Sequence, residues 1–298
     1  METRGLRYFT TTARYEHMGL AAAELGIDES TLSRSIARLE KRYGALFDRV
    51  GRRVRLNACG RVLLAHAERA LAELEYATRE ISELRGSAPQ PVRLGFVPSL
   101  GMHFVPELVT AFKRNNAGAH FRFVQAPRER LHVALLAGDL DACIACHKFA
   151  DAALAWEPLW DEELLAFLPP AHPLARRRLV DLRELAGEPM LSFKAGERLR
   201  DEVDELAQHA GFSPNVVYEA GDIPTLLGLV SLGLGIALLP ESVQANRGRA
   251  AAVRVRDSRK RTVGLSWVRD QFDAANATAF RSFVVERRAY RPWQARSA

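Results

Sequence analysis

The chain has 298 residues, 48% of them hydrophobic and 26% charged, which is ordinary for a globular protein but too long for one small module. Its three cysteines (Cys59, Cys143 and Cys146) are too few for a disulfide framework, and no window offers the ~18 uncharged apolar residues of a membrane span. The first twenty residues hold no apolar run of signal-peptide length either, so we expect a two-domain cytoplasmic protein without membrane contact.

The net charge of +6 is unevenly distributed. Residues 1–65 contain 12 Lys and Arg against 7 Asp and Glu, whereas residues 66–85 contain 3 against 5. The basic excess therefore lies at the N-terminal end, as in proteins that contact phosphates there. A solvated basic face explains the charge distribution equally well if it is taken alone.

Two helices are predicted before residue 27. Leu6, Phe9 and Ala13 form an apolar stripe on the first helix. The run 19–26 is rich in helix-forming residues and ends at Gly26, which suits the position just after a helix.

A third helix is predicted over residues 29–43, with Asp28 as its N-cap. Leu32, Ile36 and Leu39 recur at helical spacing and are expected to pack inward. Two short helices that meet at a glycine-containing turn are typical of a helix-turn-helix. A small helical bundle with a polar outer face is the alternative.

The outward face of the third helix carries side chains suited to base edges in the major groove. Arg34 can hydrogen-bond guanine through two donors, Thr31 offers a hydroxyl and a methyl group, and Glu29 can accept from cytosine. We therefore expect DNA contacts from Glu29, Ser30, Thr31, Ser33, Arg34 and Arg38.

Residues 49–56 predict a β-hairpin wing that turns at Gly51, after Leu46 and Phe47 have entered the core. Val54 and Leu56 alternate inward on the hairpin. Three arginines remain for contacts to backbone phosphates, which set the register without reading sequence: Arg52, Arg53 and Arg55.

The run AAAELGIDESTLSRSIARLEKRYGALFDRVGRRVRLNACG, residues 21–60, closely resembles the LysR-type transcriptional regulators. It matches their alanine-rich helix, their L-S-R-x-I-x-x-L-E recognition helix, their L-F-x-R and the closing x-x-G. The chain departs from the family at Asp28-Glu29-Ser30, where Ser-Gln-Pro is usual, and at Asn57, where threonine is usual. Glu29 puts the preferred base at that position in doubt, but not DNA binding.

One long helix is predicted from Gly60 to Leu84, because this stretch lacks proline. An apolar seam repeats along it at heptad spacing, at Ala67, Ala70, Leu74, Ala77, Ile81 and Leu84. Periodicity also allows a surface helix folded onto its own domain. The resemblance implies instead a homodimerisation helix that pairs two headpieces on a two-fold symmetric site in double-stranded DNA, and a dimer of dimers, a homotetramer.

From residue 92 onward predicted strands and helices alternate, which favours a largely parallel α/β sheet. The phrases LGFVPSLG, ALLAGDLDACI, EELLAFLPPAHPLA, AGFSPNVVYEAGDIPTLLGLVSLGLGIALLP and RTVGLSW resemble the LysR effector domain, which is similar to periplasmic solute-binding proteins. Two of them, LGFVPSLG and RTVGLSW, are most similar to the branch that contains the glutamate-synthase activator.

The implied organisation has three parts. An N-terminal, mainly helical winged helix-turn-helix occupies residues 1–60, and a linker helix with a hinge occupies residues 61–90. An effector-binding domain of periplasmic-binding-protein-like fold follows at 91–298, with subdomain I at 91–162 and 265–298 and subdomain II at 163–264. The crossings between subdomains are expected at 161–163 and 264–266, with a ligand cleft between them.

Ligands of open α/β sheets bind beyond the carboxyl ends of strands, where helix N-termini present free amides. We expect effector contacts at three such places and at one further cleft-side helix: Ser99, Leu100 and Gly101; Arg128; Lys194; and Ile223. Arg128 replaces a serine or threonine common in the family. Arg128 and Lys194 together favour an anionic effector such as a small carboxylate, although both are equally well explained as solvated surface cations.

The remaining sequence patterns indicate no haem, metal or catalytic site. Cys143-Ile144-Ala145-Cys146-His147 spells a haem-attachment motif, but on a strand the two thiols face opposite sides. No histidine spacing indicates a metal, and no cofactor or catalytic group is expected. Two alternatives stay open: a solute-binding or catalytic α/β protein whose N-terminal helices serve assembly only, and a redox sensor acting through its cysteines.

Overall fold

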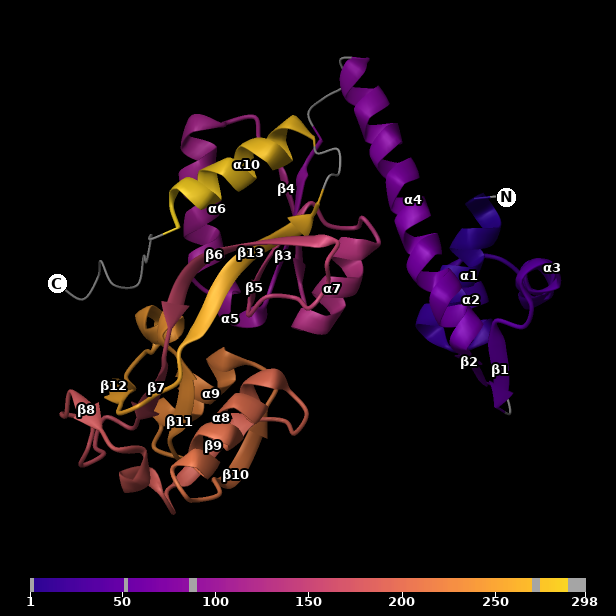
Figure 1. The fold of residues 1–298 in the computed structure, drawn as a ribbon. Coiled ribbons are helices and arrows are strands. Elements are labelled where there is room, and N and C mark those ends of the chain that lie inside the picture. Colours follow the sequence, from indigo (N-terminus) through magenta and orange to yellow (C-terminus); the bar gives the residue numbers. More distant parts are fainter. Residues whose placement is uncertain (1–2, 51–52, 86–89, 270–273, 289–298) are drawn as a thin grey trace.

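A computed structural model describes residues 3–50, 53–85, 90–269 and 274–288. The chain forms a helical headpiece, a long helix and two α/β subdomains stacked one below the other (Figure 1). Among the described residues, none of the helices is long and apolar enough to span a bilayer.

The headpiece packs three helices and a two-stranded hairpin around one core. Phe9 and Leu32 are fully buried in this core, which also takes in Val54 of the hairpin and Ala67 of the long helix. The predicted third helix and hairpin are confirmed. The elements are α1 (Thr3–Tyr15), α2 (Met18–Glu24), α3 (Glu29–Tyr43), β1 (Phe47–Val50), β2 (Arg53–Leu56) and the long helix α4 (Ala58–Leu84).

The turn between α2 and α3 is closed by backbone hydrogen bonds. Gly26 has φ +64°, and the amides of Gly26 and Ile27 donate to the carbonyls of Ala23 and Ala22. The predicted cap at Asp28 is only half right. Its backbone occupies the N-cap position, but its side chain makes no capping hydrogen bond.

The start of α4 is locked onto the headpiece. Asn57 Oδ1 accepts from the Gly60 amide at 2.9 Å, so Asn57 caps the helix. A Cβ atom at Gly60 would lie 2.1 Å from the carbonyl oxygen of Leu46, and therefore only glycine fits there. The headpiece and the first turns of α4 consequently move as one unit.

Subdomain I is built on a five-stranded sheet of order β4-β3-β5-β13-β6. Helices α6 and α10 pack on one face of the sheet and α7 on the other (Figure 1). Its elements are β3 (Val92–Phe96), α5 (Pro98–Gly101), α6 (Phe104–Asn115), β4 (Phe121–Gln125), α7 (Arg128–Leu136), β5 (Ala142–Cys146), β6 (Leu154–Glu162), β13 (Arg261–Val268) and α10 (Ala275–Glu286).

Subdomain II combines a four-stranded sheet, β11-β7-β12-β8, with a parallel pair, β10-β9. A single bridge between Met190 and Ile236 joins the two. Its elements are β7 (Leu164–Leu168), β8 (Leu179–Val180), η1 (Leu182–Leu185), β9 (Pro189–Phe193), α8 (Arg198–His209), β10 (Asn215–Ala220), α9 (Ile223–Ser231), β11 (Ala237–Pro240), η2 (Glu241–Asn246) and β12 (Ala251–Val255).

The sheets are more mixed than the alternation of elements predicts. β13 runs antiparallel to both β5 and β6, and β7 is antiparallel to both of its neighbours. The sequence reading also missed β6, β8 and β12. Pro158 and three acidic side chains interrupt the apolar pattern of β6, and β8 has only two residues.

The two crossings between subdomains lie side by side. The first is at Glu163, between β6 and β7, inside the predicted range. The second lies between Val255 and Arg261, earlier than the predicted 264–266, because β13 pairs with β6 along its whole length. Residues 261–264 therefore belong to subdomain I.

Candidate functional site

The outer face of α3 is polar and accessible. Leu32, Ile36 and Leu39 are buried as predicted. Of the six predicted DNA contacts on this helix, Glu29, Ser30, Arg34 and Arg38 are exposed, and Thr31 and Ser33 are half-buried. All six lie within the first ten residues of α3, and none of them belongs to the buried stripe.

Arg34 is held along its own helix in the free protein. Its Nη2 donates to Thr31 Oγ1 at 3.3 Å, and its Nε donates to the carbonyl of Ser30 at 3.2 Å. Both contacts are exposed and weak, so the guanidinium can exchange them for a base edge at small cost.

The wing is tied to the rest of the headpiece. The Val54 amide donates to the carbonyl of Glu16, and Glu40 Oε1 accepts from the amides of Leu46 and Phe47. Arg53 and Arg55 are exposed on β2. The third predicted phosphate contact, Arg52, lies outside the described residues.

A cavity of about 230 Å³ lies between the two subdomains, where the predicted cleft is expected. Three predicted effector contacts line it: Ser99, Arg128 and Ile223. The other three do not. Leu100 is completely buried in the core of subdomain I, Gly101 is half-buried with Phe96 beside it, and Lys194 is exposed. The two expected cations are therefore not brought together.

Arg128 is positioned by the segment after β5. Its guanidinium lies 4.3 Å from the centroid of the Phe149 ring, and its Nη2 donates to the carbonyl of Lys148 at 2.7 Å. Its Nε is buried and has no hydrogen-bond partner among the described residues. The side chain thus has a fixed place and an unused donor.

Sequence reasoning missed a buried ion pair at the base of the cavity. Arg261, the first residue of β13, donates through Nε and Nη2 to Glu162 Oε1 at 2.8 and 2.6 Å, and both side chains are almost fully buried. The other Glu162 oxygen accepts from the Ser242 amide at 3.2 Å. The sequence shows only an arginine at the edge of an apolar strand, and its partner is 99 residues away.

The ion pair extends into both subdomains. Arg261 also contacts Ser99 of subdomain I at 3.4 Å and Glu202 of α8 at 3.5 Å. Glu202 in turn contacts His147 at 3.1 Å. Burial acts to raise the pKa of Glu202, but the hydrogen bond from His147 and the charge of Arg261 hold that pKa below its usual value.

The two cysteines of β5 face opposite sides of the sheet, as predicted. Cys146 belongs to the core under α6, whereas Cys143 packs under α7. Burial raises the pKa of the Cys146 thiol to about 12 and raises that of Cys143 as well. The raised pKa values favour the protonated thiols at neutral pH, which disfavours a redox switch.

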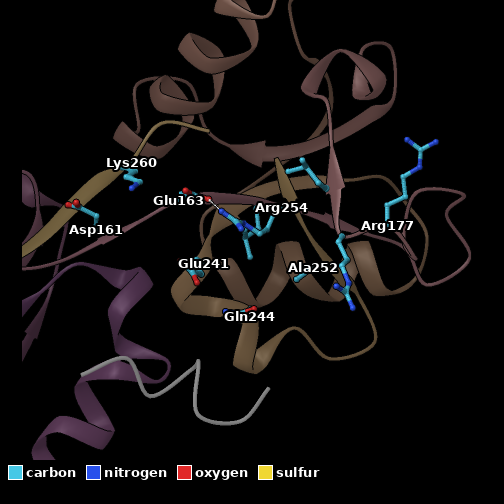
Figure 2. Close-up of a pocket in the computed structure, with 11 residues that line it drawn as sticks. Asp161, Glu163, Arg177, Glu241, Gln244, Ala252, Arg254 and Lys260 are labelled. Atoms are coloured by element: carbon cyan, nitrogen blue, oxygen red, sulfur yellow. Dashed lines mark hydrogen bonds and ion pairs between the residues drawn. The ribbon is translucent and has the colours of Figure 1, made fainter. Parts of the chain in front are cut away.

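A wider groove of about 780 Å³ lies on subdomain II (Figure 2). Two of its arginines already pair with carboxylates: Arg254 with Glu163 at 3.3 Å, and Arg177 with Glu184 at 2.6 Å. None of the predicted effector contacts lines it. We favour the smaller interdomain cavity as the effector site, because it lies at the sheet edges and its lining is mainly apolar. In the part of the chain that the structure describes, no cluster of three His, Cys, Asp or Glu side chains is arranged for a metal.

Two family profiles match the chain. Residues 3–61 match the bacterial regulatory helix-turn-helix protein, lysR family, and residues 85–289 match the LysR substrate binding domain. The chain is 36% identical to the HTH-type transcriptional regulator YybE of Bacillus subtilis, covering 96% of this chain and 98% of that protein. It is 33% identical to the transcriptional dual regulator GltC of the same organism, covering 96% and 97%.

Solved structures share the fold. A full-length OxyR variant from Pseudomonas aeruginosa superposes with a TM-score of 0.67 at 24% identity, over 98% of this chain and 96% of that one. Full-length CbnR in complex with its target DNA superposes with a TM-score of 0.59 at 23% identity, over 97% and 100%.

The buried ion pair generates a stability prediction. We expect Glu162→Gln to destabilise the effector-binding domain by about 3 kcal/mol, because it leaves the Arg261 guanidinium buried without its main counter-charge. The neighbouring Glu163→Gln, whose partner Arg254 is exposed, should cost under about 1 kcal/mol. Urea unfolding followed by tryptophan fluorescence measures both, since all four tryptophans lie after residue 155. Equal effects would contradict a structural role for the buried pair.

Proposed function

The chain belongs to the LysR family of bacterial transcriptional regulators, and from this premise we propose a sequence-specific DNA-binding regulator that is controlled by a small effector. The effector presents an anionic group, a carboxylate, to Arg128 in the cavity between the subdomains. The matched relatives are named regulators, and the chain is a regulator rather than an enzyme. We place its action in the cytoplasm, on double-stranded DNA.

The observation that carries DNA binding is the accessible face of α3 beside an arginine-bearing wing. Arg34 stands on the exposed side of α3, and Arg53 and Arg55 stand on β2. A solute-binding protein needs neither feature. In the proposed interface α3 reads the base sequence, and the wing positions the headpiece by contacting backbone phosphates.

Dimerisation through α4 is the second part of the proposal. Leu74 and Ile81 of the seam are each 49% exposed, whereas Ala67 is buried within the headpiece core. Exposed aliphatic side chains one heptad apart fit a partner helix. Two paired headpieces would read a two-fold symmetric site, and two such dimers form the tetramer.

Cleft closure would connect the two ends of the molecule. An effector that contacts both subdomains stabilises one relative placement of them over others. α4 packs against α7 of subdomain I, so a change there reaches the headpiece through a helix that is rigidly attached to it. This contact gives the effector site a physical connection to the headpiece.

Binding to the DNA just upstream of the protein's own gene tests the headpiece. We expect preference over a scrambled duplex, a steep loss of affinity with salt, and about a ten-fold or greater loss on Arg34→Ala. Arg249→Ala, which removes an exposed arginine of subdomain II, is the matched control and should leave affinity unchanged. Absence of binding even at low salt would refute the headpiece assignment.

Placing carboxylates on the apolar seam of α4 tests the proposed dimer. The double variant Leu74→Glu, Ile81→Glu should dissociate into monomers in sedimentation analysis, because four carboxylates would face one another across the paired helices. The control Leu20→Glu, which charges another exposed leucine, should keep the native assembly. Native assembly in the double variant would exclude this seam as the interface.

The effector contact is tested by calorimetry of the full chain with a panel of small carboxylates. Arg128→Ala should weaken the binding of any carboxylate ligand by about ten-fold or more, since a hydrogen bond to a charged group contributes ~1.5–3 kcal/mol. Lys194→Ala removes a cation outside the cavity and should change nothing. Unchanged affinity in Arg128→Ala would reject the proposed contact.

A further inference from the structure

The charges that line the interdomain cavity balance in number. The lining contains three guanidinium groups and three carboxylates: Arg128, Arg198, Arg261, Glu129, Glu197 and Glu202. Such a lining offers no net positive field to an anion. Its selectivity must therefore come from individual charges that the protein itself leaves without a partner.

Three of these six charges are neutralised within the protein. Arg261 is paired with Glu162 and Glu202, and Arg198 contacts Glu202 at 3.3 Å. These groups form one compensated cluster at the floor of the cavity. Arg261 and Glu202 are largely buried within this cluster, and the charge of Arg198, whose side chain is 56% exposed, is compensated by Glu202.

Arg128 is the cation that remains. It forms no ion pair among the described residues, and its hydrogen bond goes to a neutral carbonyl, that of Lys148. Its buried Nε has no partner. A buried donor without an acceptor is costly, and a ligand carboxylate would supply that acceptor.

Glu197 is the carboxylate that remains on the opposite wall. Its backbone occupies the N-cap position of α8 in subdomain II, but its side chain makes no capping hydrogen bond. It is half-buried and forms no ion pair within the described part of the chain. Glu129, next to Arg128, is exposed, so solvent screens its charge more effectively.

We propose that the effector is a zwitterion, an α-amino acid with an apolar side chain. Its carboxylate binds Arg128 of subdomain I and its ammonium group binds Glu197 of subdomain II. This inference rests on the proposed function and adds the second charge. One ligand then bridges both walls, which ties binding directly to closure of the cleft.

The rest of the lining suits an apolar side chain. Six aliphatic or aromatic residues contribute to it: Val97, Pro98, Pro127, Phe193, Leu199 and Ile223. The volume of about 230 Å³ lies below the ~300–1,000 Å³ typical of drug-sized ligands, and it matches a single amino acid better than a peptide or nucleotide. A second carboxylate would find no second free cation, because Lys194 lies outside.

A direct ion pair between Arg128 and Glu197 in a closed cleft is the competing explanation for these two charges. In that case a ligand needs no amino group, and neutralising Glu197 would affect all ligands alike. The two explanations therefore differ in whether Glu197 discriminates between ligands.

Calorimetry on the full chain separates them. The probes are L-valine, L-leucine, L-isoleucine, L-methionine and L-phenylalanine, each beside the carboxylate that lacks its amino group, such as 4-methylpentanoate for leucine and 3-phenylpropanoate for phenylalanine. We expect at least one amino acid to bind about ten-fold or more tightly than its deaminated counterpart. Glu197→Gln should abolish that difference by weakening the amino acid alone, again by about ten-fold.

Asp201→Asn is the matched control. It removes one negative charge from the first turn of the same helix, at an exposed residue outside the cavity lining, and should leave both affinities unchanged. Circular dichroism establishes that each variant is folded as the parent is.

Three results would overturn the inference. They are binding of none of the amino acids at millimolar concentration, equal or tighter binding of the deaminated carboxylates, and equal weakening of both ligand classes by Glu197→Gln. Deaminated carboxylates that bind as tightly as the amino acids, and in an Arg128-dependent manner, would defeat the zwitterion while leaving the proposed function intact. Insensitivity of every ligand to Arg128→Ala would defeat the proposed effector contact itself.

Discussion

The buried pair of Arg261 and Glu162 is the constraint on which the effector-binding domain depends. Two opposite charges removed from water are tolerable only when their remaining donors and acceptors are satisfied. Here Ser99, Glu202 and the amide of Ser242 satisfy them, and these groups come from both subdomains. Because this cluster must stay complete, the two segments that cross between the subdomains are held side by side. The cavity lies directly above them.

The same cluster explains why the cavity is selective rather than simply basic. An arginine that already has two carboxylate neighbours offers little to an incoming anion, even though it lines the cavity. Arg128 has only a carbonyl and an aromatic face around it. Whether an arginine of this cavity is structural or can bind a ligand thus depends on whether it already has carboxylate partners within the protein.

At the junction of the headpiece and α4, a steric constraint fixes the geometry. Gly60 lets the backbone of α4 approach Leu46, and Asn57 caps the helix at that contact. The headpiece therefore cannot swivel on a flexible joint at the start of α4. Reorientation of the headpieces on DNA must come from the other end of α4 or from the packing between copies, which is where an effector-dependent change in the second domain can act.

The two-subdomain α/β architecture was predicted from the resemblance to the LysR family. The amino-acid sequence alone predicted the helix-turn-helix, the wing and the long helix, because each depends on local periodicity, caps and turns. It also placed Cys143 and Cys146 on opposite faces, since a strand alternates with period two. The tertiary structure was needed to show that Lys194 lies outside the cavity and that Arg261 meets Glu162. It was also needed to show that Arg128 and Glu197 line the cavity from different subdomains without an ion pair to any residue that the structure describes. Those outcomes depend on strand register and burial between residues far apart in the chain, and no local pattern encodes which distant charge will be the neighbour.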